Sequence, residues 1–131
     1  MEKSIDIRNR ILRYSEKWMD ISFLENLFSQ KDGVLLIGTD PNEWWADYET
    51  IISGLKYAIG EMSGVSVIDV ETKAYSEGTV GWSSSRIIMK MPDASEVPAR
   101  LTSVFHQENG EWKIVQYHVS IGVSNEEALG I

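Results

Sequence analysis

The sequence predicts an α+β fold in which helices come first and an antiparallel sheet follows. Before Gly64 the apolar residues recur mostly at helical spacing, whereas after it they alternate with the period of two that is typical of strands. The pair Asn109-Gly110 separates two runs rich in β-branched and aromatic residues, which is the strongest short-range signal of a β-hairpin. Helices followed by such a meander are expected to lie together on one face of the sheet.

Two helices and a strand are predicted in the first part of the chain. The first helix, near residues 3–20, rests on an apolar stripe with spacings of four and three: Ile7, Ile11, Tyr14, Trp18 and Ile21. Ser22 and Glu25 form a capping-box pattern, which predicts that a second, shorter helix starts there and ends before Gly33. The aliphatic run from Val34 to Ile37 is then predicted to be a short buried strand.

A third helix is predicted to begin at Asp40 and to continue to about Gly60. Asp40 suits the N-cap, Pro41 the first helical position and Glu43 the third position, so three start signals fall within four residues. These capping roles explain both carboxylates without catalysis. The N-terminal end of this helix carries large aromatic side chains, including Trp44, and is expected to lie over the mouth of any cavity in the fold.

Four strands are predicted near residues 65–76, 79–91, 97–107 and 111–121. The turn sets the register of the last two, and both faces of their hairpin are then apolar: Phe105, Val115, Tyr117 and Val119 on one face, and Val104, Trp112 and Ile114 on the other. A sheet with one face in water alternates apolar and polar residues more cleanly. We therefore expect helices on one face and a second subunit on the other, giving a homodimer through the outer sheet face.

The composition limits the classes of function. A chain of 131 residues with 43% hydrophobic residues is expected to form one domain over residues 1–131. The net charge of −8 argues against a nucleic-acid or anionic-membrane partner. The absence of cysteine excludes disulfides and thiolate metal sites and fits a cytoplasmic location. Neither a signal peptide nor a membrane span is expected, and the sequence indicates no metal or cofactor.

Several segments carry a family resemblance. They are residues 38–45 (Gly-Thr-Asp-Pro-Asn-Glu-Trp-Trp), Gly81-Trp82, residues 100–105 and residues 109–120. Together with the order of elements, they resemble the SnoaL-like (polyketide cyclase-like) group of the nuclear transport factor 2-like superfamily, over nearly the whole chain. The closing segment is also similar to the association domain of calcium/calmodulin kinase II. The resemblance implies a cone in which N-terminal helices pack in a curved antiparallel sheet around a pocket, commonly in a dimer through the outer sheet face.

Two groups of residues are candidates for ligand binding. The aromatic group is expected at the pocket mouth or, alternatively, as filling for the wide end of the cone: Trp44, Trp45, Tyr48 and Trp82. The second group is expected on the inward face of the sheet: Ser83, Ser85, Ser103, Phe105, Tyr117 and Val119. The small serines leave room for a ligand, although an edge segment or a bulge would also explain them.

The resemblance also raises the question of a pocket that binds a carboxylate. In the kinase association domain arginines occupy pocket-facing positions where this chain has Ser103 and Val119, so such a pocket is not expected here. A register shift of one residue would change this, because it would turn Arg86 and Arg100 inward.

No complete catalytic constellation is recognisable in the sequence. A ketosteroid-isomerase type of site needs a carboxylate base and an oxyanion-stabilising Tyr or protonated Asp. Asp69 is the only Asp inside a predicted strand, whereas Tyr14 and Tyr117 could donate to an oxyanion or merely satisfy their hydroxyls locally. His106 and His118 share a predicted outer face, where a structural or dimer contact is the simpler explanation, and two histidines alone make a poor metal site.

The sequence thus predicts a small-molecule-binding SnoaL-like protein of unknown specificity. Acid–base catalysis on an apolar, ring-bearing metabolite is a further hypothesis, and whether the chain is an enzyme stays open at this point. The alternative is a non-catalytic homodimerisation or accessory module with the same fold. The identity of the ligand, the reaction and the pathway cannot be read from the residues.

Overall fold

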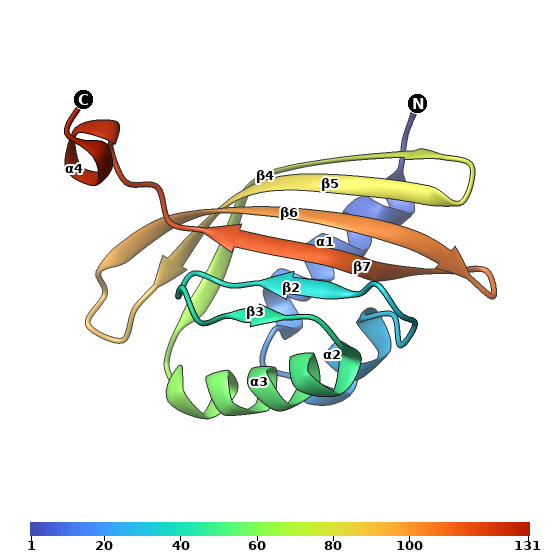
Figure 1. Ribbon diagram of the computed structural model, residues 1–131, viewed down its shortest axis with the longest axis horizontal. Coiled ribbons are helices and arrows are strands. Elements are labelled where there is room, and N and C mark those ends of the chain that lie inside the picture. The colour runs from blue at the N-terminus through green and yellow to red at the C-terminus, as the bar shows by residue number, and fades with distance from the viewer.

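Seven strands form one curved sheet in the computed structural model, which describes residues 1–131 (Figure 1). Four long strands run antiparallel to their neighbours: β4 (Ser66–Glu77), β5 (Val80–Lys90), β6 (Glu96–Glu108) and β7 (Glu111–Ser120). Three short strands complete the order β1-β4-β5-β6-β7-β2-β3: β1 (Glu2–Lys3), β2 (Leu35–Ile37) and β3 (Trp44–Trp45). The predicted α+β class and the four predicted long strands are confirmed.

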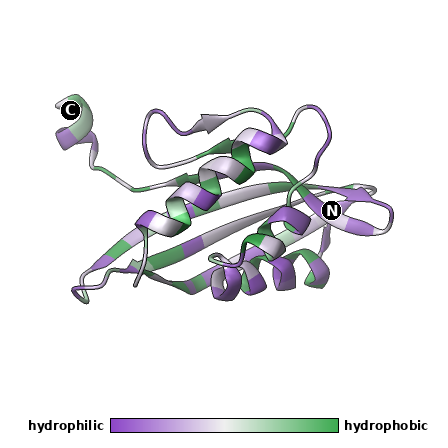
Figure 2. Cartoon of the chain, turned by 90° about the horizontal axis from the view of Figure 1, so that it is seen from below, coloured by the Kyte–Doolittle hydropathy of each residue, from purple (hydrophilic) through white to green (hydrophobic).

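Three helices pack in the concave side of this sheet. They are α1 (Ile5–Lys17), α2 (Ile21–Leu27) and α3 (Tyr48–Glu61), whereas a fourth, α4 (Asn125–Leu129), stands clear of the sheet (Figures 1 and 2). The apolar stripe of α1 is buried as predicted, with Ile7 and Ile11 at 0% and 2% exposure. No helix has both the length and the apolar character that crossing a lipid bilayer requires.

The second helix starts earlier than the capping-box pattern predicts. Asp20, not Ser22, is its N-cap, and the Asp20 carboxylate accepts a hydrogen bond of 3.2 Å from the backbone N–H of Phe23. Aspartate is a strong N-cap and comes first in the chain, directly after α1, so it sets the helix start before Ser22 is reached.

The third helix starts later than predicted. The expected capping contacts at Asp40 do form, because its backbone N–H donates to Glu43 Oε1 over 2.8 Å and its carboxylate accepts from the N–H of Asn42 over 2.9 Å. The chain then leaves the turn as strand β3, since Trp44 and Trp45 pair with β2. The helix begins at Tyr48 after a second N-cap at residue 47. Sheet pairing of the aromatic residues therefore overrides the first helix signal.

The hairpin between β6 and β7 has the predicted turn but not the predicted faces. Asn109 and Gly110 adopt positive φ angles of 51° and 81°, as the two-residue turn requires. The register shifts beside Val115, because Val104 pairs with Gln116 whereas Phe105 pairs with Ile114. This β-bulge moves the start of β7 to the other face.

The bulge corrects the expectation that both hairpin faces are apolar. Trp112 and Ile114 are buried on the concave face together with Tyr117, at 9%, 0% and 6% exposure. The Trp112 side chain therefore does not mark the outer face. The hairpin now shows a more regular division between a buried face and a more polar face, and Figure 2 shows hydrophobic and hydrophilic residues interleaved along the strands.

Candidate functional site

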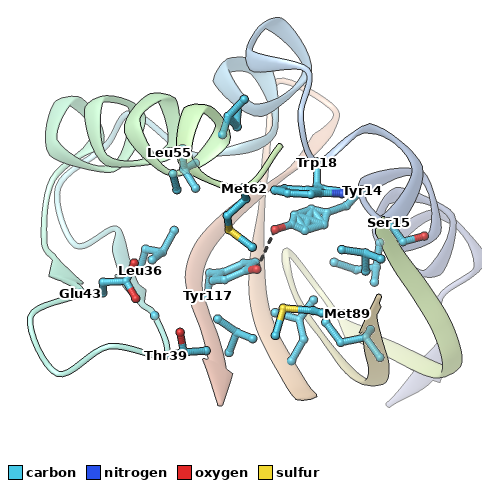
Figure 3. Close-up of a pocket in the computed structure, with 18 of the residues that line it drawn as sticks. Tyr14, Ser15, Trp18, Leu36, Thr39, Glu43, Leu55, Met62, Met89 and Tyr117 are labelled. Atoms are coloured by element: carbon cyan, nitrogen blue, oxygen red, sulfur yellow. Dashed lines mark hydrogen bonds between the residues drawn. The ribbon is translucent and has the colours of Figure 1, made fainter. Parts of the chain in front are cut away.

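A cavity of about 130 Å³ opens between α1, α3 and the concave face of the sheet (Figure 3). Fifteen of its twenty lining residues are hydrophobic. They come from α1 and α3 with the residues that follow each helix, from β2 and β3, and from all four long strands. They include Trp18, Leu36, Leu55, Met62, Met89 and Leu101. An apolar wall with few polar groups is typical of sites that bind small molecules.

Two tyrosine hydroxyls meet inside this cavity. Tyr14 comes from the apolar stripe of α1 and Tyr117 from the inward face of β7, and their oxygens lie 2.7 Å apart (Figure 3). The rings are tilted by 56°, with centroids 5.7 Å apart. Each hydroxyl has one hydrogen, and the bond between them uses only one. The pair therefore keeps one O–H to donate to an acceptor atom in the cavity.

Burial keeps both hydroxyls protonated. It raises the pKa of Tyr117 well above its usual value, and the neighbouring Tyr14 and the negative charge of Glu43 raise it further. Burial also raises the pKa of Tyr14, although the hydrogen bond to Tyr117 partly opposes this. Ionised tyrosinates are therefore disfavoured at neutral pH, and the pair acts as a hydrogen-bond donor rather than as an anion.

A β-bulge in β4 brings a carboxylate to the cavity. The register with β5 shifts between Asp69 and Glu71, so that Asp69 and Thr72 both face the concave side. The Thr72 hydroxyl bonds to the Asp69 carboxylate and lies 2.8 Å from Ser85 Oγ. Asp69 lines the cavity and is half-buried. Its carboxylate is thus held in place from the side of the sheet, with an oxygen available to a ligand.

A second carboxylate, Glu43, lies in the segment between β2 and β3. Its Oε1 accepts the hydrogen bond from Asp40 that defines the turn, and Glu43 lines the cavity on the side of Thr39 (Figure 3). The cavity therefore combines the free O–H of the tyrosine pair, the Thr39 hydroxyl and two carboxylates in mostly apolar walls. This arrangement can orient a small molecule that carries an acceptor oxygen.

Three of the ten predicted ligand-binding residues line the cavity: Trp45, Tyr117 and Val119. The Trp45 ring lies directly against Gly54 in α3, where any larger residue would collide with it. Trp44 is 62% exposed, and the Tyr48 hydroxyl donates to the backbone oxygen of Glu25 over 2.7 Å instead of reaching the cavity. Of the aromatic side chains that were expected near the start of the third helix, only Trp45 therefore lines the cavity.

The remaining predicted residues lie elsewhere on the sheet. Trp82 lies on the outer face and stacks on Tyr75 with ring centroids 6.3 Å apart. The other four are buried on the concave face but outside the cavity wall: Ser83, Ser85, Ser103 and Phe105. A Cβ added at Gly81, on the same face, would collide with Ile7 of α1, so the small residues of β5 make room for this helix. The binding role of the ten residues stays a prediction.

The cavity also contains residues that were not predicted as ligand contacts. Trp18, like Tyr14, belongs to the stripe that predicted α1, so helical periodicity marked its burial without marking a site. Met62 follows α3 and Met89 lies in β5, and no local pattern indicates that both line one cavity (Figure 3). The sequence could have indicated Asp69 as a site residue, because an acid in the interior of a predicted strand is unusual.

The outer face holds the remaining charged candidates. His106 and His118 share that face as predicted, and His106 Nδ1 lies 3.8 Å from a carboxylate oxygen of Glu108. Arg86 and Arg100 also point outward, since they alternate with buried neighbours, so neither reaches the cavity. No group of three or more histidine and acidic side chains is arranged to hold a metal ion.

Comparison with models of known protein families identifies the family of this chain. The family model of the SnoaL-like domain matches residues 11–124. The chain belongs to the SnoaL-like family. The match spans the cavity-lining elements from α1 to β7, and the resemblance noted in the sequence is confirmed. A search of the curated proteins found no match.

Solved structures share the fold of this SnoaL-like domain at low sequence identity. A nuclear transport factor 2-like protein of unknown function from Pseudomonas putida has a TM-score of 0.78 at 14% identity, covering 95% of this chain and 93% of that chain. A proposed dehydratase from Streptomyces avermitilis has a TM-score of 0.75 at 11% identity, with coverages of 91% and 95%. A proposed ketosteroid isomerase from Shewanella frigidimarina has a TM-score of 0.72 at 14% identity, with coverages of 86% and 92%. At these identities the likeness shows the fold alone.

Proposed function

We propose that this SnoaL-like domain, formed by residues 1–131, binds an apolar, ring-bearing small molecule in the cavity. The observation that carries the proposal is the free O–H of the pair formed by Tyr14 and Tyr117 within apolar walls. A ring would contact the hydrophobic side chains, and an acceptor oxygen on it would take the free hydrogen bond. Trp45, Tyr117 and Val119 are kept from the sequence prediction as ligand contacts, and a cytoplasmic location is part of the proposal.

The volume of the cavity limits the size of the ligand. A buried apolar cavity of about 150 Å³ is large enough for benzene, whereas drug-sized ligands occupy roughly 300–1,000 Å³. The cavity here has about 130 Å³. A molecule with one ring therefore fits, and a fused ring system would require the walls to move.

Binding is tested with two probes of equal size, cyclohexanone and methylenecyclohexane, which differ only in an oxygen or a CH₂ group. Cyclohexanone is expected to raise the melting temperature more, because a ligand that prefers the folded state stabilises it. The double variant, Tyr14→Phe with Tyr117→Phe, is expected to weaken cyclohexanone binding up to about tenfold, the value of one net hydrogen bond, whereas each single variant keeps one hydroxyl that can donate. Tyr57→Phe is the control, because Tyr57 lies on α3 at 73% exposure. Equal binding of both probes, or of neither, would refute the proposal.

Acid–base catalysis is the further part of the proposal. Asp69 would remove a proton from the carbon next to a carbonyl group, and the electron pair would move to the carbonyl oxygen, where the free O–H of the tyrosine pair stabilises the charge. The names of two structural neighbours, a proposed dehydratase and a proposed ketosteroid isomerase, are consistent with such chemistry.

Deuterium exchange at the α-carbons of cyclohexanone, followed by proton NMR in D₂O, tests this step. Asp69→Asn is expected to slow the exchange by about 10²–10⁴-fold, the usual contribution of a general base. The Asn oxygen still accepts the hydrogen bond from Thr72, so the fold should be retained. Asp32→Asn, at an exposed loop residue, is the matched control. Equal rates for wild type and Asp69→Asn would exclude Asp69 as the base.

A non-catalytic homodimerisation module is the second candidate, favoured by apolar side chains on the convex side of the sheet. Ile68, Val70 and Val80 are 42%, 57% and 42% exposed. A second copy covering this outer face would remove them from water. Sedimentation equilibrium at micromolar concentration is expected to give the mass of a dimer, and a monomeric mass would refute the homodimer.

A further inference from the structure

The C-terminal arm, residues 123–131, extends away from the sheet of its own chain. Every residue of the arm is exposed, and α4 stands apart from the sheet in two perpendicular views (Figures 1 and 2). Val123, Leu129 and Ile131 are 56%, 69% and 81% exposed. The arm therefore presents apolar side chains that nothing in the chain covers.

The helix in this arm is too short to be stable alone. It has five residues, an N-cap at Ser124 that accepts from the N–H of Glu127 over 3.1 Å, and a left-handed C-cap at Gly130. Isolated helices shorter than about 12–15 residues are marginal in water even with good caps. A surface on which α4 packs would supply the missing stabilisation. The only charged side chains of the arm are those of Glu126 and Glu127.

A surface of complementary charge lies on the outer face of the sheet. Arg86 of β5 and Arg100 of β6 are direct partners in the register, and two like charges in this position repel each other. Neither guanidinium forms an ion pair within the chain, because the nearest acid in the register, Glu71, pairs with Lys73 over 3.4 Å. Arg100 Nε donates only to Ser120 Oγ, over 3.3 Å. Both guanidinium groups are therefore available to form ion pairs with carboxylates of another chain.

The arginine pair borders an apolar hollow. The hollow has a volume of about 480 Å³ and is lined by Val70, Ile88, Pro98 and Ile121 together with the two arginines. It therefore offers both kinds of contact that the arm lacks, apolar side chains for Leu129 and cations for the two glutamates.

We infer that the C-terminal arm of one copy docks in this hollow of a second copy. Glu126 and Glu127 pair with Arg86 and Arg100, and Leu129 packs on the apolar side chains. A twofold axis makes the exchange reciprocal, so that each copy gives one arm and receives one. The inference rests on the proposed homodimer and adds that the two arms hold it together.

The cysteine-free chain allows a direct test by disulfide cross-linking. A tagged Ala128→Cys chain, with the cysteine in α4, is mixed with an Ile88→Cys chain, with the cysteine in the hollow, and oxidised mildly. A mixed covalent dimer is expected. The control partner is Lys56→Cys, on the exposed side of α3, which should give no mixed dimer above background. A chain carrying both Ala128→Cys and Ile88→Cys should give covalent dimers, whereas an internal disulfide in a monomer would overturn the exchange between copies.

Charge reversal provides the second arm of the test. Glu126→Arg with Glu127→Arg, or Arg86→Glu with Arg100→Glu, is expected to raise the dimer dissociation constant at least tenfold in sedimentation equilibrium. A mixture of the two reversed chains should recover the affinity, because both arms of the mixed dimer again meet opposite charge. A monomeric wild type would refute the homodimer and the docking together. A stable dimer without cross-links and without an effect of charge reversal would refute the docking alone.

Discussion

The hydrogen bond between Tyr14 and Tyr117 makes the effects of their substitutions non-additive. Tyr14→Phe leaves the Tyr117 hydroxyl, in a residue with 6% exposure, without its partner. A buried hydroxyl without a partner costs about 1–3 kcal/mol. Tyr117→Phe leaves the Tyr14 hydroxyl without its partner, and because this hydroxyl is also buried the cost should again be about 1–3 kcal/mol. The double variant removes both hydroxyls and should cost less than Tyr14→Phe alone.

The coupling energy in this double-mutant cycle is therefore expected to be about 1–2 kcal/mol. Urea unfolding followed by fluorescence of the five tryptophans measures it. With a urea slope of about 2 kcal/mol per M, 1 kcal/mol moves the midpoint by roughly 0.5 M, which is easily resolved. Tyr57→Phe, at an exposed position, should leave the midpoint unchanged. If the two single costs add up in the double variant, the hydroxyls do not stabilise each other and the reasoning about the pair is wrong.

Three further predictions concern stability. Because the pKa of Tyr117 is raised in the folded state, the protonated hydroxyl contributes its full stability below pH about 10. This contribution is lost as the pH rises through the pKa of the folded state, by up to about 1.4 kcal/mol per pH unit. Urea midpoints measured from pH 8 to 11 should therefore fall less steeply in Tyr117→Phe. Ser83→Ala should stabilise the fold by about 1 kcal/mol, because its buried hydroxyl has no partner, whereas Ser85→Ala should cost about 1 kcal/mol by removing a hydrogen bond; chemical denaturation that ranks the two in the opposite order would contradict this. Gly81→Ala should cost about 1–3 kcal/mol by collision with α1, whereas Gly60→Ala, with open space around it, should be neutral or stabilising in thermal denaturation.

Much of the fold follows from local patterns in the sequence. The four long strands were predictable because period-two alternation and turn residues such as Asn109-Gly110 act over short distances. The start of α3 was not predictable from local patterns. The capping contacts at Asp40 form within a turn, and the helix does not follow because Trp44 and Trp45 pair with β2, which no local pattern indicates. The bulge at Val115 adds one residue without any turn signal, so regular alternation put Trp112 on the wrong face.

The candidate site was harder to predict because its parts come from distant segments. Tyr14 and Tyr117 are 103 residues apart, and the patterns indicate that each is buried but not that they meet. The serines of β5 show the opposite difficulty. Their small size was interpreted as room for a ligand, whereas the space over Gly81, on the same face of this strand, is taken by Ile7 of α1. Small residues on a sheet indicate a close approach without identifying what approaches.

The bulge in β4 has a consequence beyond the cavity. Only Tyr75 and Ser76 of this strand pair with β1, and the Ala74 carbonyl accepts from the N–H of Ser4 over 3.0 Å. The part of β4 before Ala74 has no strand on this side, and such an edge can template the addition of a foreign strand. The irregularity between Asp69 and Glu71 interrupts this border, and the charges of Glu71 and Lys73 lie beside it. Fibril-like growth through backbone pairing is thereby discouraged. The irregularity that turns Asp69 toward the cavity is thus also expected to oppose aggregation through this edge.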